Sequence, residues 1–322
     1  MEQEKIASRY GLGTRTSFSA PLPNARRSEK SKMELTFLAQ AIVSGLLTGG
    51  LYALISVGLT LIFGVMRIIN FAHGDLMMLA MYVTYWMFTL YGVDPLISLI
   101  VTVPALFVIG LVIQKFLINQ VLDAPQGSQL FLTLGLMLVV QNMALLLWRA
   151  DYRAIRTYYT GSVIRLGEVF ISVPRLASFA VATILTGVLY IFLTRTRIGK
   201  AMRATAQNRE VASVMGVDVR RIYLVAFGIG TACVGAAGTL LSTFYYISPT
   251  AGTTFTLTAF SAVVLGGMGS FTGASFGGLL LGVAESLGAV YIATQYRELT
   301  TFLLLIFILL VRPSGLLGKS RV

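Results

Sequence analysis

The sequence is a succession of long apolar runs separated by short polar stretches. From Ile222 to Ala284, sixty-three consecutive residues include no Asp, Glu, Lys, Arg or His. Because a helix needs about 20 apolar residues to cross the hydrocarbon core of a bilayer, this run contains more than one crossing. The Ser248-Pro249 pair and the glycines of residues 266–278 predict where the chain turns back. We therefore expect an integral membrane protein.

The charge-free windows predict the helices. They are residues 35–66, 76–93, 95–114, 124–148, 176–194, 222–284, 286–296 and 299–311. The first window is too long for one upright helix and short for two, so its glycines predict a helix that tilts, breaks or turns within the membrane. We expect an all-α, polytopic integral membrane protein with about 8–10 transmembrane or re-entrant helices and glycine-rich breaks.

Composition and charge narrow the class of protein further. Apolar residues make up 56% of the chain and charged residues 12%, which argues against a water-soluble domain. One cysteine, Cys233, and one histidine, His73, predict neither a disulfide framework nor a metal site. The net charge of +12 comes from basic residues between the apolar windows. This pattern predicts contact with lipid head groups and argues against nucleic-acid binding.

The basic residues also predict the orientation. Residues 195–221 hold seven Lys or Arg, and the tail after Val311 holds three, so we expect both to be cytoplasmic. An even number of crossings, best four, must then separate them. The segment 149–175 is consequently expected outside, although its five Arg oppose that assignment.

Residues 1–32 contain no apolar core, so they predict neither a signal peptide nor a crossing. We expect them to be a disordered or wrongly assigned extension, with residues 33–322 forming a single transmembrane domain.

A polar cluster lies at the start of the second window. Asn70, His73 and Asp75 fall within six residues, and polar groups at membrane depth usually face a pathway or cavity. The alternative is a short loop in which Asn70 and Asp75 are turn or N-cap residues.

Three further polar residues are candidates for a translocation pathway. Glu285 closes the long charge-free run, so it could face a pathway or a subunit contact, or lie on a helix at the membrane interface. Gln141 and Asn142 could contact a ligand, but hydrogen bonding between helices is the preferred interpretation.

Small residues recur four positions apart and predict close helix packing. The pairs are Gly45/Gly49, Gly273/Gly277 and Gly278/Gly282, with Ser56/Thr60/Gly64 as a triplet. Residues 273–277 also match the G-x-S-x-G pattern of serine hydrolases. No strand is expected before Ser275, so we predict no catalytic residues and no enzyme activity.

The basic loop includes a segment with helical character. Residues 199–216 predict one short helix ended by Gly216. Its weakly apolar positions could dock onto a peripheral partner, or lie in the membrane interface. These positions are Ala201, Ala204, Thr205, Val211, Ala212 and Met215.

Several stretches together resemble one known family. Residues 49–54 (GGLYAL) and 70–75 (NFAHGD) are similar to the opening of LivH-type permeases of branched-chain amino acid ABC transporters. Residues 199–216, 262–278 and 312–318 resemble the same family, in the same order. The resemblance covers about residues 34–318.

The resemblance implies the membrane subunit of an importer in a bacterial or archaeal inner membrane. Such subunits work with a second related permease, two cytoplasmic ATPases and a periplasmic substrate-binding protein. ATP is then bound by the partner subunits, and this chain needs no cofactor of its own.

The resemblance also implies that residues 199–216 act as a coupling helix. Glu210-Val211-Ala212 stands where the family motif has Glu-Ala-Ala, and Gly216 stands at the motif's glycine. The candidate coupling residues are Arg203, Asn208, Glu210, Ala212 and Gly216.

Two alternative functions stay open. Related permeases carry urea or short amides. An ion-coupled secondary transporter is the other alternative, although such proteins are expected to show more intramembrane ionisable residues or inverted repeats.

Overall fold

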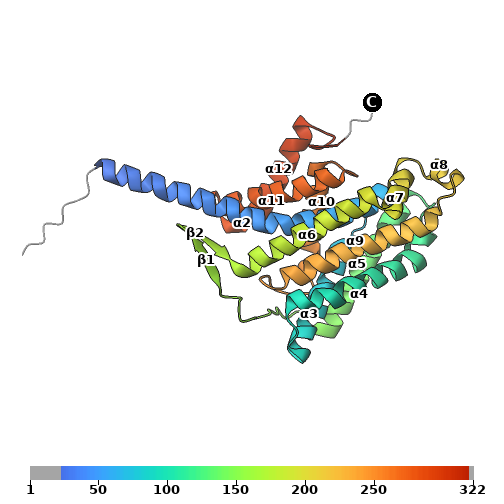
Figure 1. Ribbon diagram of the computed structural model, residues 1–322, viewed down its shortest axis with the longest axis horizontal. Coiled ribbons are helices and arrows are strands. Elements are labelled where there is room, and N and C mark those ends of the chain that lie inside the picture. Colours follow the sequence, from blue (N-terminus) through green and yellow to red (C-terminus); the bar gives the residue numbers. More distant parts are fainter. Residues whose placement is uncertain (1–22, 319–322) are drawn as a thin grey trace, which may run out of the picture. The chain divides into compact units, whose positions relative to one another are not determined.

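The computed structural model describes residues 23–318, most of which lie in helices (Figure 1). The chain divides into a short unit, Met1–Leu38, and a larger unit, Ala39–Val322. Of the expected N-terminal extension, residues 1–22 lie outside the described residues. Residues 23–32 belong to the first described helix.

The described helices are α2 (Pro23–Met66), α3 (His73–Tyr91), α4 (Pro95–Phe116), α5 (Gln126–Trp148), α6 (Val173–Arg195), α7 (Arg197–Gln207), α8 (Arg209–Val214), α9 (Val219–Leu241), α10 (Ala251–Gly266), α11 (Phe271–Tyr291) and α12 (Arg297–Val311). Two 3-10 turns lie at Ile118–Gln120 and Thr294–Tyr296. Among the described helices, α2, α4, α5, α6, α9 and α11 are long and apolar enough to cross a membrane, whereas α10 and α12 are shorter apolar helices. The predicted all-α, polytopic architecture is confirmed.

The charge-free windows place α3, α4, α5 and α6 to within three residues at each end. The turn predicted at Ser248-Pro249 is confirmed, because these residues lie between α9 and α10. Of the glycine segment 266–278, residues 267–270 separate α10 from α11 as predicted, and residues 271–278 belong to α11. The first window is different. It forms part of the uninterrupted helix α2, so the alternatives of a break or a turn are wrong.

The glycines of α2 serve packing instead of bending. A Cβ added to Gly45 would lie 2.6 Å from Val283 Cα of α11, and one added to Gly49 would lie 2.9 Å from Leu279 Cα. A Cβ on Gly282 would in turn lie 2.5 Å from Gly45 O. The two predicted small-residue pairs, one on each helix, therefore face each other, and the prediction of close packing is confirmed.

Two helices form the centre of the larger unit. Every residue of α2 from Gly49 to Ile62 is buried. Helix α9 packs along α4 and α3 (Figure 1), and 78% of its most apolar window is buried, against 11% for α5. Since the exposed residues of α5 are largely apolar, that helix is suited to contact lipid.

A two-stranded antiparallel hairpin, β1 (Val163–Leu166) and β2 (Val169–Ser172), was not predicted and lies between α5 and α6. The segment before it is tied to other connections. Tyr159 donates a hydrogen bond to Asp94 Oδ1 at 3.1 Å, and Arg153 N donates to Ile247 O at 2.9 Å. We call this side, comprising residues 91–95, 149–172 and 243–250, the hairpin end.

Five other segments lie at the other side, which we call the loop end. It comprises residues 66–67, 117–129, 196–218, 266–270 and 312–318. Leu316 N donates to Leu265 O at 2.9 Å, which holds the C-terminal segment against the end of α10. The rings of Tyr190 and Phe271, 5.6 Å apart, join the last turns of α6 to the start of α11. The basic loop and the C-terminal segment therefore lie on the same side.

Candidate functional site

Residues 196–216 form two short helices and not the single helix predicted. Thr196 caps α7 by accepting a hydrogen bond from Gly199 N at 3.0 Å. A Cβ on Gly199 would lie 2.5 Å from Leu193 Cα, so this glycine lets α7 lie directly against the last turn of α6. Arg203, on the exposed side of α7, donates to Thr194 O at 3.3 Å.

The break between α7 and α8 occurs at Asn208. Its backbone is extended, with φ −153° and ψ 110°, and its side chain accepts hydrogen bonds from Glu210 N at 2.9 Å and Val211 N at 3.1 Å. Asparagine is among the best N-cap residues because its side chain satisfies these otherwise unpaired amides. The single-helix prediction overlooked this signal. The predicted glycine end is confirmed, since Gly216 follows α8 with φ +86°.

Helix α8 buries one small residue and exposes larger apolar ones. Ala212 is 4% exposed, whereas Val211, Val214 and Met215 are 57%, 87% and 78% exposed. Of the predicted weakly apolar positions, Thr205 and Ala212 thus face the protein, and Val211 and Met215 face outward. Clustered exposed apolar side chains are typical of a contact surface. We call Val211, Val214 and Met215 the α8 face.

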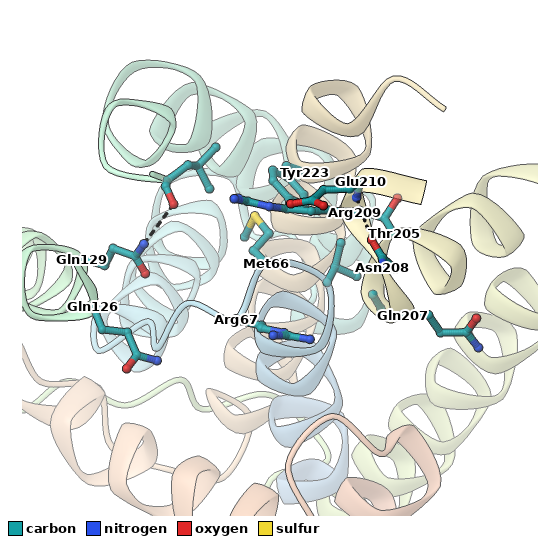
Figure 2. A pocket seen from close by; sticks show the side chains of 13 residues that line it. Met66, Arg67, Gln126, Gln129, Thr205, Gln207, Asn208, Arg209, Glu210 and Tyr223 are labelled. Carbon is teal, nitrogen blue, oxygen red and sulfur yellow. Dashed lines mark hydrogen bonds between the residues drawn. The ribbon is translucent and has the colours of Figure 1, made fainter. Parts of the chain in front are cut away.

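A cavity of about 450 Å³ lies at the loop end, beside the junction of α7 and α8 (Figure 2). The end of α2, the start of α5 and the α7–α8 junction form its walls. Figure 2 shows Gln126 and Gln129 on one side, Arg67 at the end of α2, and Thr205 and Asn208 across from the glutamines. The coupling candidates Asn208 and Glu210 therefore line a cavity.

The polar cluster at the start of α3 is enclosed by protein. Asn70, His73 and Asp75 are all fully buried. Asn70 Oδ1 accepts a hydrogen bond from Ala72 N at 3.1 Å, which is the role of a turn residue, and His73 Nε2 donates to Ile55 O at 3.1 Å. Asp75 is not the N-cap, because Ala72 occupies that position.

The beginning of α10 covers this cluster. Gly74 N donates to Thr256 Oγ1 at 3.0 Å, and a Cβ on Gly252 would lie 2.8 Å from Asp75 Cα. Neither carboxylate oxygen of Asp75 has a hydrogen-bond partner among the described residues. A buried acidic group without a partner is costly, so the tight packing of α3 on α10 must offset that cost.

The other three pathway candidates lie on two helices, Glu285 on α11 and the pair Gln141 and Asn142 on α5. Glu285 is 4% exposed and accepts hydrogen bonds from Tyr52 Oη at 2.9 Å and Thr301 Oγ1 at 3.0 Å, which joins α11 to α2 and α12. Asn142 is exposed and donates to Leu138 O of its own helix at 2.8 Å, and Gln141 is half-buried. These contacts do not bring the six candidates together into one site.

Sequence reasoning missed several residues that line the cavity. Arg67 is the first charged residue after the long first window, and Gln126 and Gln129 are among the first polar residues of α5. The sequence signal that could identify these residues is their position, as polar residues at the ends of apolar windows. Their convergence depends on how α2, α5 and α7 pack, which the sequence pattern does not contain.

Comparisons with known proteins identify the family. A family model described as the permease component of branched-chain amino acid transport systems matches residues 41–311. The high-affinity branched-chain amino acid transport permease BraD of Pseudomonas aeruginosa is 34% identical over 302 residues, and LivH of Escherichia coli K12 is 33% identical over 305 residues. Each alignment covers 90% of this chain and 98% of the relative.

A second kind of permease matches only in part. LivM of Escherichia coli K12 is 35% identical over 132 residues, which are 40% of this chain and 30% of LivM. No solved structure matches the chain. Because the family model spans residues 41–311 and relatives above 30% identity cover nine tenths of the sequence, the chain belongs to the family of branched-chain amino acid transport permeases.

Proposed function

We propose that this chain is the membrane-spanning permease subunit of an ATP-binding-cassette importer that translocates Leu, Ile and Val. The observation that carries the proposal is the alignment over 90% of the chain with permeases named for branched-chain amino acid transport. The six long apolar helices support a path through the bilayer for a small solute. The location is the cytoplasmic membrane of a bacterium or an archaeon, and an archaeal LivH relative is 29% identical over 287 residues.

An importer of this kind needs other subunits besides this permease. It acts with a second, related permease, and the partial similarity to LivM supports such a pairing. A periplasmic binding protein delivers the solute at the hairpin end, and two ATPases bind at the loop end. This orientation makes the loop end cytoplasmic, which agrees with the seven basic residues of 195–221.

The α8 face is the proposed docking surface for an ATPase. Val211 and Val214 are exposed on this helix of six residues, and the exposed Met215 follows it directly. Ala212 packs against the protein, and the Asn208 cap fixes the start of the helix. ATP is bound and hydrolysed by the partners. Closure of the ATPases moves α8 and favours the outward-facing arrangement, and their separation favours release to the cytoplasm.

The first experiment is purification from the native membrane in mild detergent, with subunits identified by mass spectrometry. We expect recovery with a second permease and two ATPases, and ATP-dependent leucine uptake in liposomes that carry the binding protein. Uptake of urea or short amides in place of leucine would favour the alternative substrate. Recovery alone, with uptake that persists without ATP, would replace the proposal with an ion-coupled carrier.

A variant of the α8 face tests the docking surface. Val214→Glu places a charge on a side chain that is 87% exposed, so the chain should fold normally but lose its ATPases during purification. Val214→Ile keeps an apolar surface and serves as the matched control. ATPase recovery equal to the control would show that α8 is not the docking element.

A further inference from the structure

The cavity at the loop end is lined by opposite charges that do not pair with each other. The Arg67 guanidinium and the Glu210 carboxylate make no ion pair with any residue that the structure describes. Arg209, which also lines the cavity, has its charge partly satisfied by Asp123 at 3.3 Å. Both residues are exposed, so the cavity offers one positive and one negative group that are accessible to a ligand.

A buried hydroxyl provides an independent sign of a ligand. Thr205 is 3% exposed, and its Oγ1 has no hydrogen-bond partner among the described residues. Buried polar atoms are nearly always paired, so an unpaired hydroxyl on a cavity wall is suited to a bound molecule.

Gln129 adds a fixed acceptor on the opposite wall. Its Nε2 donates to the carbonyl oxygens of Val121, Leu122 and Ala124, each at 3.1 Å. The two hydrogens of this NH2 group are shared among the three carbonyl oxygens, which hold the amide in one orientation with Oε1 as an acceptor. A preorganised acceptor of this kind is suited to an ammonium group.

Most of the cavity lining is polar, and a smaller part of it is apolar. Val65 and Met66 at the end of α2, together with Leu122 and Tyr223, line it. A volume of about 450 Å³ is in the range of small-molecule sites. A doubly negative anion such as phosphate suits the cavity less well than a zwitterion, because Glu210 would repel it.

We infer that this cavity binds an α-amino acid with an apolar side chain at the cytoplasmic face, with the carboxylate at Arg67 and Thr205 and the ammonium group at Glu210 and Gln129 Oε1. The inference rests on the proposed function for the solute and for the orientation. The α7–α8 junction forms one wall, and α8 also carries the ATPase-docking face. Solute and ATPase therefore act on the same element, and if the solute changes the affinity for the ATPase, linkage requires the ATPase to change the affinity for the solute by the same factor.

Binding of radiolabelled L-leucine to the complete membrane complex in nanodiscs, without the binding protein, tests the site. Arg67→Asn removes the guanidinium and keeps a residue that tolerates φ 59°, and it should weaken binding about tenfold or more. Thr205→Val keeps the shape and should weaken binding about threefold to tenfold. Lys115→Gln, an exposed cation of α4 outside the cavity, should leave binding unchanged.

Competition identifies the chemistry of the ligand. Unlabelled leucine should compete at least tenfold better than isoamylamine, which has no carboxylate, or 4-methylpentanoate, which has no ammonium group. Equal competition by 4-methylpentanoate or inorganic phosphate would overturn the inference in favour of a simple anion site. If Arg67→Asn fails to fold, Thr205→Val decides alone, and unchanged binding in that variant overturns the site.

The two proposals fail in different ways. Absence of ATP-dependent leucine uptake by the wild-type complex would contradict the proposed function. Normal uptake by the wild-type complex with no leucine binding in the nanodisc experiment would remove only the cytoplasmic site.

Discussion

Helix α11 lies so close to α2 that a single added methyl group should separate them. A Cβ on Gly282 would lie 2.5 Å from both Gly45 O and Gly49 Cα. Since non-bonded carbon atoms prefer about 3.5–4.0 Å, Gly282→Ala requires the helices to move apart by roughly 1 Å. Both contacts are with backbone atoms, which cannot rotate away as a side chain could.

The expected cost follows from this displacement. Overpacking of a well-packed site typically costs about 1–3 kcal/mol. A gap approaching 1 Å along the rest of the contact also loses roughly a quarter to a half of the dispersion energy of each atom pair there. We expect Gly282→Ala to lower the free energy of unfolding by about 2 kcal/mol, which is more than tenfold in the folded-to-unfolded ratio. Gly45→Ala on the facing helix should act similarly, and the double variant should lose less than the sum because the first methyl group already separates the helices.

The chain provides its own reporter for this measurement. Cys233 is the single cysteine of the sequence and is buried in α9, so a thiol-reactive dye should label it only on unfolding. Titration of the detergent-solubilised protein with SDS gives the midpoint and the free energy of unfolding. Gly135→Ala is the matched control, because no described atom lies within 4 Å of the added Cβ. Equal stability of Gly282→Ala and Gly135→Ala would refute the reasoning.

Three further changes test other parts of the structure. Glu285→Leu removes the acceptor of the hydrogen bonds from Tyr52 Oη and Thr301 Oγ1 and should cost about 1–3 kcal/mol in the same SDS titration, whereas Glu285→Gln keeps an acceptor and should cost less. Asn208→Ala removes two capping bonds and should cost about 1 kcal/mol, with faster hydrogen exchange at the amides of α8, and Asn208→Asp should restore the protection. Gly216→Arg places a charged side chain at a backbone φ of +86°, and it should uncouple transport by weakening ATPase association in co-purification; normal association would contradict the coupling assignment.

The positions of the lipid-facing helices could be predicted from the sequence because one physical quantity dominates there. Hydrophobicity over about 20 residues determines whether a helix crosses a bilayer, so the windows located α4 and α5 closely. The long helix α2 is a case in which hydrophobicity alone does not determine the structure. Its glycines were compatible with bending or with close packing, and only the positions of α6, α9 and α11 decide between the two.

Short elements required local signals that hydrophobicity does not carry. Asn208 ends one helix and caps the next through two hydrogen bonds, although the residues on both sides favour helix. The hairpin has a sequence signal in Gly167-Glu168, a two-residue turn between β-branched and apolar runs, and the charge pattern of 149–175 does not carry that signal. The burial of Asp75 could not be predicted from hydrophobicity either, because the segment that covers it begins with Ala251, far along the chain.

Tight packing of the centre and exposure of the loop end together constrain how this protein can move. Helix α2 meets α11 at Gly45 and meets α9 at Gly58, whose Cβ would lie 2.8 Å from Gly230 O, so these helices cannot slide without breaking backbone contacts. Helix α8, by contrast, exposes all of its residues except Ala212. A force applied to α8 therefore displaces α7 first, and α7 rests on the last turn of α6 through Gly199. A small displacement at the loop end can then pass to the bundle through α6 and also through α9, on which α7 and α8 pack.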